Sequence, residues 1–222
     1  MVDIFDILGP IMVGPSSSHT AGAARIGAMA RTLLGSRPVQ AEIGLHRSFA
    51  ETGPGHGTDR ALVAGLLGMK PDDLRIPQSF EVAAEEGLQF RFHEVRLREA
   101  HPNTAVLELT GEDGKTLRMQ ASSVGGGRIR VDKLDDVDVG FTGDYNTLII
   151  HSLDVSGELA NVTREISRAK INIANMSLYR SRRGGAVLMV IETDQVVPPV
   201  VQQLIDELPG VAQVTCYEKG ED

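Results

Sequence analysis

A segment near the start of the chain places three serines and a histidine directly before a stretch of helical periodicity. It spans residues 14–20 and reads Gly-Pro-Ser-Ser-Ser-His-Thr. Hydroxyls and free backbone N–H groups at the start of a helix suit a carboxylate or a phosphate, and a histidine there could exchange a proton near neutral pH. The same residues also suit a plain helix cap beside a solvated histidine. The candidate residues of this segment are Ser16, Ser17, Ser18, His19 and Thr20.

A second segment, residues 51–60, surrounds His56 with three glycines and leads into another helical pattern. Glycines let the backbone approach a ligand closely and leave room for the imidazole ring, so we predict a loop here. The segment lacks the Gly-Lys-Ser/Thr ending of a Walker loop, and its spacing does not fit the dinucleotide-binding pattern Gly-x-Gly-x-x-Gly. A third glycine run, residues 125–127, is more typical of a tight bend between strands than of a ligand site. The other histidines, which we interpret as structural or exposed, are His46, His93, His101 and His151.

The elements that must position these segments follow from the hydrophobic pattern. Apolar residues recur at helical spacing from Ala23 to Leu33, after serines that can cap the helix and before Gly35, which can end it. A strand is predicted over residues 39–49, and a second helix is capped at Thr58-Asp59. Further strands are expected at residues 90–95, 104–109 and 116–122, which gives a mixed α/β domain over residues 1–135.

An aspartate-rich segment separates two regions of the chain. Residues 132–146 contain five aspartates and two glycines, so we predict a linker at 136–146 between domains at 1–135 and 147–222. The second domain has the pattern βαββαβ. Two helices on one face of a four-stranded antiparallel sheet predict a ferredoxin-like sandwich, and the fold class is α+β. The expected elements are strands at 147–152, 171–179, 186–193 and 211–217 and helices at 157–169 and 199–208.

Composition excludes several classes of protein. A net charge of −8 and an aromatic content of 4% with no Trp argue against nucleic-acid binding, which depends on basic and stacking side chains. No stretch approaches 18 apolar residues, and Asp3 and Asp6 occupy the positions where a secretory signal is basic. We therefore expect a cytoplasmic protein without a membrane partner. Cys216 is the only cysteine, which excludes an internal disulfide and any all-cysteine metal site built from this chain alone.

The three segments, in this order, resemble the beta region of the bacterial iron–sulfur L-serine dehydratases. The family pattern of Gly-Pro-Ser-Ser-Ser-His-Thr, Gly-His-Gly-Thr-Asp and Ser-x-Gly-Gly-Gly is matched at Gly14–Thr20, Gly55–Asp59 and Ser123–Gly127. This likeness covers about residues 1–135, a region that is also similar to allosteric substrate-binding domains. Residues 147–217 resemble an ACT domain, a small module that often binds amino acids as a regulator.

The resemblance implies a lyase that converts L-serine into pyruvate and ammonia with a [4Fe–4S] cluster and without pyridoxal phosphate. One cysteine cannot supply the thiolates of such a cluster, so the chain resembles a beta subunit whose alpha partner holds it, and no metal ligand is expected here. In the implied site, His19 and His56 position L-serine or handle protons, and the serines of residues 16–18 bind its carboxylate. Further substrate- or effector-binding candidates are Thr20, Gly55, Gly57, Thr58, Asp59, Gly125 and Gly126.

The sequence leaves two alternatives open for the function of the chain. The same loops could bind L-serine as an effector, because the N-terminal domain resembles an allosteric substrate-binding domain. The chain could also be a free-standing amino-acid sensor, which would act without an iron–sulfur partner. For the ACT-like part, the resemblance implies either a ligand site or a docking and self-association module. The ligand candidates there are Asp154, Gly157, Leu159 and Asn175.

Overall fold

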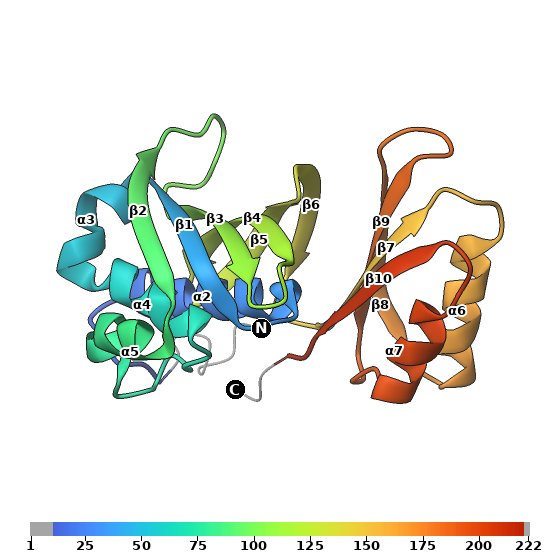
Figure 1. Ribbon diagram of the computed structural model, residues 1–222, viewed down its shortest axis with the longest axis horizontal. Helices are drawn as coiled ribbons and strands as arrows, with labels where there is room; N and C mark the ends of the chain where they lie inside the picture. The colour runs from blue at the N-terminus through green and yellow to red at the C-terminus, as the bar shows by residue number, and fades with distance from the viewer. Residues whose placement is uncertain (1–10, 220–222) are drawn as a thin grey trace, which may run out of the picture. The chain divides into compact units, whose positions relative to one another are not determined.

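The computed structural model describes residues 11–219 and divides the chain into two compact units (Figure 1). The N-terminal unit ends at Thr142 and the C-terminal unit begins at Gly143. Asp3 and Asp6, which entered the expectation of a cytoplasmic protein, lie outside the described residues. Among the helices of the described part, none is both long and apolar enough to span a bilayer.

A six-stranded sheet forms the centre of the N-terminal unit, in the order β2-β1-β3-β4-β5-β6 (Figure 1). β1 and β2 run parallel, and the other neighbouring strands run antiparallel. Ile43, Leu107 and Met119 are paired across β1, β3 and β4 and are buried on one face of the sheet. The strands are β1 (Pro38–His46), β2 (Gln89–Val95), β3 (Thr104–Gly111), β4 (Thr116–Gly125), β5 (Arg128–Leu134) and β6 (Val137–Thr142).

Two helices, α2 (Gly22–Leu34) and α4 (Thr58–Leu66), pack against each other, and α2 lies on β3, β4 and β5. Glycine permits this close crossing, since a Cβ on Gly27 would lie only 2.3 Å from Leu62 O. The predicted first helix is confirmed: its apolar residues are buried, and Gly35 ends it with a φ of 73°. The buried face of α2 therefore joins the sheet to the second layer of helices.

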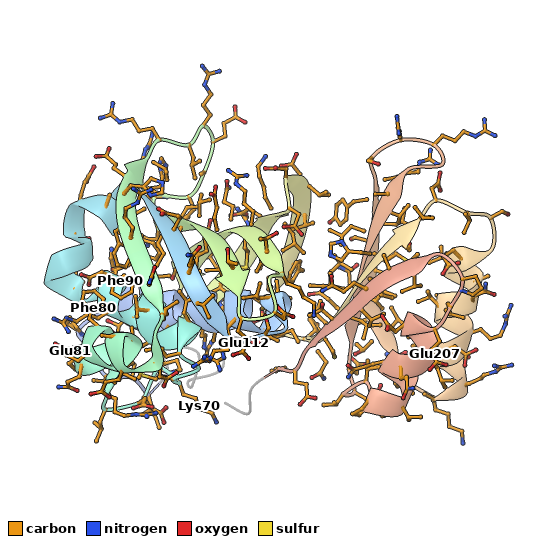
Figure 2. All side chains as sticks on the ribbon, in the orientation of Figure 1. Lys70, Phe80, Glu81, Phe90, Glu112 and Glu207 are labelled. Carbon is orange, nitrogen blue, oxygen red and sulfur yellow. The ribbon has the colours of Figure 1, made fainter. Side chains whose placement is uncertain are left out.

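Helix α5 (Ser79–Glu86) was not predicted from the sequence. It follows the short 3₁₀ turn η2 (Ile76–Gln78) and covers the edge of the sheet. Phe80 of α5 lies beside Phe90 of β2, with ring centroids 4.9 Å apart (Figure 2). Arg60 of α4 lies 4.8 Å from the centroid of the Phe80 ring, so one aromatic side chain joins α4, α5 and β2.

The glycine-rich segment around His56 is helical, so the expected loop is wrong. Helix α3 spans Ser48–His56 and ends at Gly57, whose φ of 69° is left-handed. Its glycines disfavour a helix, but Phe49 is completely buried, and tertiary packing overrides propensity. Gly57 is also the N-cap residue of α4. No side chain caps this helix, so the expected cap at Thr58-Asp59 is wrong.

Residues 137–142 form strand β6, so the expected linker at 136–146 is wrong over most of its length. β6 pairs with β5 through a turn in which Asp135 and Asp136 have φ of 46° and 67°. Two consecutive residues with positive φ are typical of a type I′ hairpin, and aspartate tolerates that conformation. The aspartates that indicated a linker instead form a turn within the sheet.

The C-terminal unit has the predicted βαββαβ order, which confirms the α+β class. Its strands form an antiparallel sheet in the order β10-β7-β9-β8, with both helices on one face (Figure 1). A single core joins Leu148 and Ile191 of the sheet to Val162 and Ile205 of the helices. The elements are β7 (Asn146–Leu153), α6 (Glu158–Arg168), β8 (Ile173–Arg180), β9 (Ala186–Thr193), α7 (Pro199–Asp206) and β10 (Val211–Tyr217).

Candidate functional site

The three motif segments of the N-terminal unit meet at the start of α2. A π-helical turn, η1 (Ser17–Ala21), precedes α2 and contacts α3, α4 and β4. The approach to β4 is so close that a Cβ on Gly22 would lie 2.1 Å from Ser123 Oγ. Arg25 Nη1 also donates a hydrogen bond of 3.3 Å to Gly127 O. The start of α2 and the third motif are therefore in direct contact, directly after the π-helical turn of the first motif, a type of turn that is frequent in functional sites.

His19 and His56, from the first and second motifs, lie side by side. Their ring centroids are 5.0 Å apart, and the rings are tilted by 47°. Thr20 Oγ1 donates a hydrogen bond of 3.2 Å to His56 O, which joins η1 to the end of α3. His56 is exposed and His19 is half-buried, so the pair combines one open ring with one sheltered ring.

Hydroxyl groups lie at both ring nitrogens of His19. Ser16 caps η1 by accepting a hydrogen bond from His19 N–H at 3.2 Å, and its Oγ lies 3.3 Å from His19 Nδ1. On the other side, His19 Nε2 lies 2.9 Å from Thr52 Oγ1 and 3.1 Å from Ser48 Oγ. Sequence reasoning missed Ser48 and Thr52. Their spacing of four residues places them on one helical face, a signal that appears only if this segment is recognised as a helix.

The surroundings of His19 lower its pKa. Burial is the largest cause, the neighbouring His56 acts in the same direction, and a hydrogen bond at the Ser48 backbone opposes both. His19 is therefore neutral at pH 7, with one ring nitrogen that donates and one that accepts. A neutral imidazole in this position is able to take up a proton from a bound molecule.

Two buried hydroxyls near this junction have no hydrogen-bond partner in the described part of the chain. They belong to Thr58, at the start of α4, and Ser123, at the end of β4, and both residues are completely buried. Gly125 and Gly126, with φ of 103° and 61°, form the predicted bend after Ser123. Buried hydroxyls are normally satisfied by protein, water or a ligand. The junction of the three motifs is therefore the strongest candidate for binding a small polar molecule.

The other predicted residues of the first two motifs support the backbone around the histidines. Ser17 and Ser18 are half-buried within η1. Gly55 is an exposed residue of α3, and Gly57 supplies the left-handed residue between α3 and α4. Asp59 Oδ1 accepts a hydrogen bond of 2.8 Å from the next backbone N–H, in the first turn of α4. These residues shape the turns that carry His19 and His56.

Two of the ligand candidates of the C-terminal unit form hydrogen bonds with other residues of the unit. Asp154 Oδ2 accepts hydrogen bonds from a backbone N–H of the β8–β9 turn at 2.8 Å and from Arg180 Nη1 at 3.3 Å. Asn175 Nδ2 donates to Glu192 Oε2 at 3.0 Å. Glu192 alternates with core residues along β9, so Asn175 lies on the sheet face opposite the helices. The remaining candidates, at the start of α6, are Gly157 and Leu159.

A buried carboxylate of the C-terminal unit was not among the predicted residues. Glu158, the first residue of α6, is buried, and its Oε1 has no hydrogen-bond partner among the described residues. Burial raises its pKa. A Cβ on Gly210 would lie 3.5 Å from Glu158 Oε2, so the α7–β10 turn approaches this carboxylate closely. Glutamate is common in first helical turns, so the residue type alone carried no functional signal.

The residues of this chain do not fit an iron–sulfur cluster. Among residues 11–219, no group of three His, Cys, Asp or Glu is placed to hold a metal ion. The single cysteine, Cys216, packs against the core of the C-terminal unit. Burial, with a contribution from Glu218, raises its pKa to about 11. Cys216 is therefore a thiol at neutral pH, whereas clusters are held by several thiolates.

Comparison with family models identifies both parts of the chain. The serine dehydratase beta chain model matches residues 1–86, and the ACT domain model matches residues 146–210. The class is therefore that of an α+β chain in which a domain with a paired-histidine site precedes an ACT domain. The predicted resemblance to both families is confirmed.

Individual relatives define the family more closely. The chain is 38% identical to a protein named probable L-serine dehydratase, beta chain, from Bacillus subtilis, over 96% of each chain. It is 36% identical to the L-serine dehydratase beta chain of Peptoniphilus asaccharolyticus, over 95% of this chain and 94% of that one. An L-serine dehydratase of Helicobacter pylori is 27% identical over 75% of this chain, which covers 41% of that protein. The chain belongs to the family of L-serine dehydratase beta chains.

Proposed function

We propose that this chain is the beta subunit of a cytoplasmic two-chain L-serine dehydratase, which converts L-serine into pyruvate and ammonia together with an alpha subunit. The observation that carries the proposal is the pairing of His19 with His56, 5.0 Å apart, beside the hydroxyl-rich turn η1. Beta-chain relatives matched along nearly their whole length support the subunit assignment.

The residues of this chain leave one part of such an enzyme to the partner. Cys216 is a single, half-buried thiol, which does not suit an iron–sulfur cluster. We propose that the alpha subunit holds the [4Fe–4S] cluster and that pyridoxal phosphate is not required. The histidines of this chain would then act on the α-proton of L-serine, and its hydroxyls would bind the carboxylate.

Dehydration of L-serine requires the loss of a proton from Cα and of the hydroxyl from Cβ. The resulting aminoacrylate then hydrolyses to pyruvate and ammonia. The α-proton is a weak acid, so a correctly placed neutral base accelerates its removal. His19 is neutral at pH 7, and no described group bonds the ring nitrogens of His56, so this pair is suited to proton transfer. The serines of η1 and the buried hydroxyls of Thr58 and Ser123 supply donors for the carboxylate.

The test is pyruvate release from L-serine after anaerobic co-expression with an alpha subunit. We expect His19→Asn and His56→Asn each to lower turnover by about 100-fold or more, the usual contribution of a general base. His93→Asn is the control, because His93 is an exposed residue of β2 and should leave turnover unchanged. Wild-type rates in both histidine variants, or pyruvate from this chain alone, would reject the proposal.

The same measurement separates a substrate site from an effector site. If the loops bind L-serine only as an effector, the two variants keep the maximal rate at saturating L-serine and change the concentration at which it is reached. If the loops belong to the catalytic site, the maximal rate itself falls.

We also propose that two copies associate through the ACT domain. In the described sheet β8 is an outer strand that pairs with β9, and Met176 and Leu178 on it are 39% and 44% exposed. An outer strand with exposed apolar residues favours pairing with a second chain. Light scattering should show a dimeric mass that Leu178→Glu abolishes. Leu204→Glu, an exposed leucine of α7, should keep the dimer, and a dimer of Leu178→Glu would contradict this interface.

A further inference from the structure

The hydrogen bonds of Thr52 determine which ring nitrogen of His19 carries the proton. Thr52 Oγ1 lies 2.7 Å from the carbonyl oxygen of Ser48, which can only accept, so the hydroxyl proton of Thr52 is directed there. The same oxygen lies 2.9 Å from His19 Nε2. Because a hydroxyl has a single proton, Thr52 Oγ1 must accept its second hydrogen bond from Nε2–H.

Helix α3 supplies two more contacts that hold the ring in this orientation. Ser48 Oγ lies 3.1 Å from His19 Nε2 and offers a second acceptor for the same proton. The ring of Phe49 meets the ring of His19 edge-on, with centroids 5.4 Å apart and an interplanar angle of 64°. Ser48, Phe49 and Thr52 lie within two turns of one helix, so α3 as a rigid element orients the imidazole.

We propose that Thr52, supported by Ser48, is a positioning residue that holds His19 as the Nε2–H tautomer. The lone pair then lies on Nδ1, the nitrogen 3.3 Å from Ser16 Oγ and on the side of the serine-rich turn η1. A proton taken from a bound molecule adds to Nδ1 and forms an imidazolium whose Nε2–H stays bonded to Thr52. The opposite tautomer would present an N–H to the same side and could not accept that proton.

This tautomer follows from contacts within the chain, whereas its consequence for turnover rests on the proposed function. Orientation of a catalytic base by a third group is a general feature of activated sites, because the wrong tautomer is inactive. Thr52 fills this role with a neutral hydroxyl, which accepts the bond from Nε2–H without adding a charge beside the ring. The structure thus assigns a function to a residue that the motifs alone do not mark.

Nitrogen-15 NMR of the histidine rings in the full-length chain measures the tautomer directly. The signals of His19 are identified by their loss in His19→Asn. At a pH above the pKa of His19, we expect a protonated Nε2 and an unprotonated Nδ1. A protonated Nδ1 in the wild-type chain would overturn the proposal.

Matched variants test whether Thr52 is the cause. Thr52→Val removes the hydroxyl, and we expect the His19 nitrogens to exchange between both tautomers, whereas Thr52→Ser keeps the hydroxyl and the wild-type signals. Thr32→Val is the control, because Thr32 Oγ1 also donates to the carbonyl four residues earlier, at 3.0 Å, but on α2. Unchanged His19 signals in Thr52→Val would contradict the assignment.

Turnover of the reconstituted complex tests the consequence. We expect Thr52→Val to lower it roughly two- to tenfold, the usual effect of one neutral hydrogen bond, with Thr52→Ser and Thr32→Val near the wild type. If His19→Asn keeps full turnover while the NMR result holds, the proposed function fails and the positioning role stands. If His19→Asn is inactive but Nδ1 is protonated, the proposed function stands and the positioning role fails.

Discussion

In the N-terminal unit, hydroxyls from two distant segments surround His19 beside His56, whereas in the C-terminal unit two of the expected ligand residues bond to other residues of the unit. Asp154 holds the β8–β9 turn, and Asn175 bonds to Glu192 on the opposite face of the sheet from α6. The first arrangement leaves hydrogen-bonding groups available to another molecule. The second uses them to stabilise a fold.

The groups without partners sharpen this difference. Among the described residues, the unpartnered buried groups of the N-terminal unit include the hydroxyls of Thr58 and Ser123, near the start of α4 and of α2. The C-terminal unit has an unpartnered hydroxyl on Ser152 and, unlike the N-terminal unit, an unpartnered carboxylate oxygen, on Glu158 beside the α7–β10 turn. A buried hydroxyl without a partner costs a modest amount of free energy, whereas a buried carboxylate makes the free energy of unfolding of its unit depend on pH.

The largest effect is expected where the start of α2 touches the third motif. Gly22→Ala would place a Cβ 2.1 Å from Ser123 Oγ, so α2 and β4 must move apart. We expect the free energy of unfolding of the N-terminal unit to fall by about 1 to 3 kcal/mol, the usual cost of overpacking. Hydrogen exchange in the full-length chain should show the loss of protection in the N-terminal unit before the C-terminal unit.

A second substitution checks the cause of this effect. Ser123→Gly removes the Oγ that Gly22→Ala would meet, so the double variant should recover most of the lost protection. If the amides of Gly22→Ala are protected as well as those of the wild type, the close contact between α2 and the third motif is wrong.

A smaller effect is expected at Glu158. Burial raises its pKa in the folded state, so between the unfolded and the folded pKa the folded chain binds more protons. The stability of the C-terminal unit should therefore fall as the pH rises through this window. We expect Glu158→Gln to stabilise the unit by about 1 kcal/mol at pH 7 and to have little effect at acid pH.

Urea unfolding followed by amide exchange measures this change in each unit. Glu207→Gln is the control, because Glu207 is an exposed carboxylate of the same unit (Figure 2). A pH-independent effect of Glu158→Gln, or a loss of stability at pH 7, would show that the carboxylate is satisfied by another group. The C-terminal unit would then not contain an unpartnered buried carboxylate.

The accuracy of the sequence-based expectations varied along the chain for identifiable reasons. The C-terminal βαββαβ order was predictable because its apolar residues keep a regular period and its turns carry glycine or proline. Helix α3 was not predictable, because Gly53 and Gly55 disfavour a helix, which is stabilised by tertiary contacts such as the burial of Phe49. The hairpin at Asp135-Asp136 was missed for a similar reason: aspartates serve linkers and tight turns alike.

The sequence by itself determined the two-part organisation, the residue types of the three motifs and the single cysteine, because these depend on local pattern and count. Only the tertiary structure decided that His19 lies beside His56, that Gly22 touches Ser123, and that hydroxyls from α3 bond His19. These contacts join residues far apart in the chain, and such contacts arise from packing around a shared core rather than from local preference.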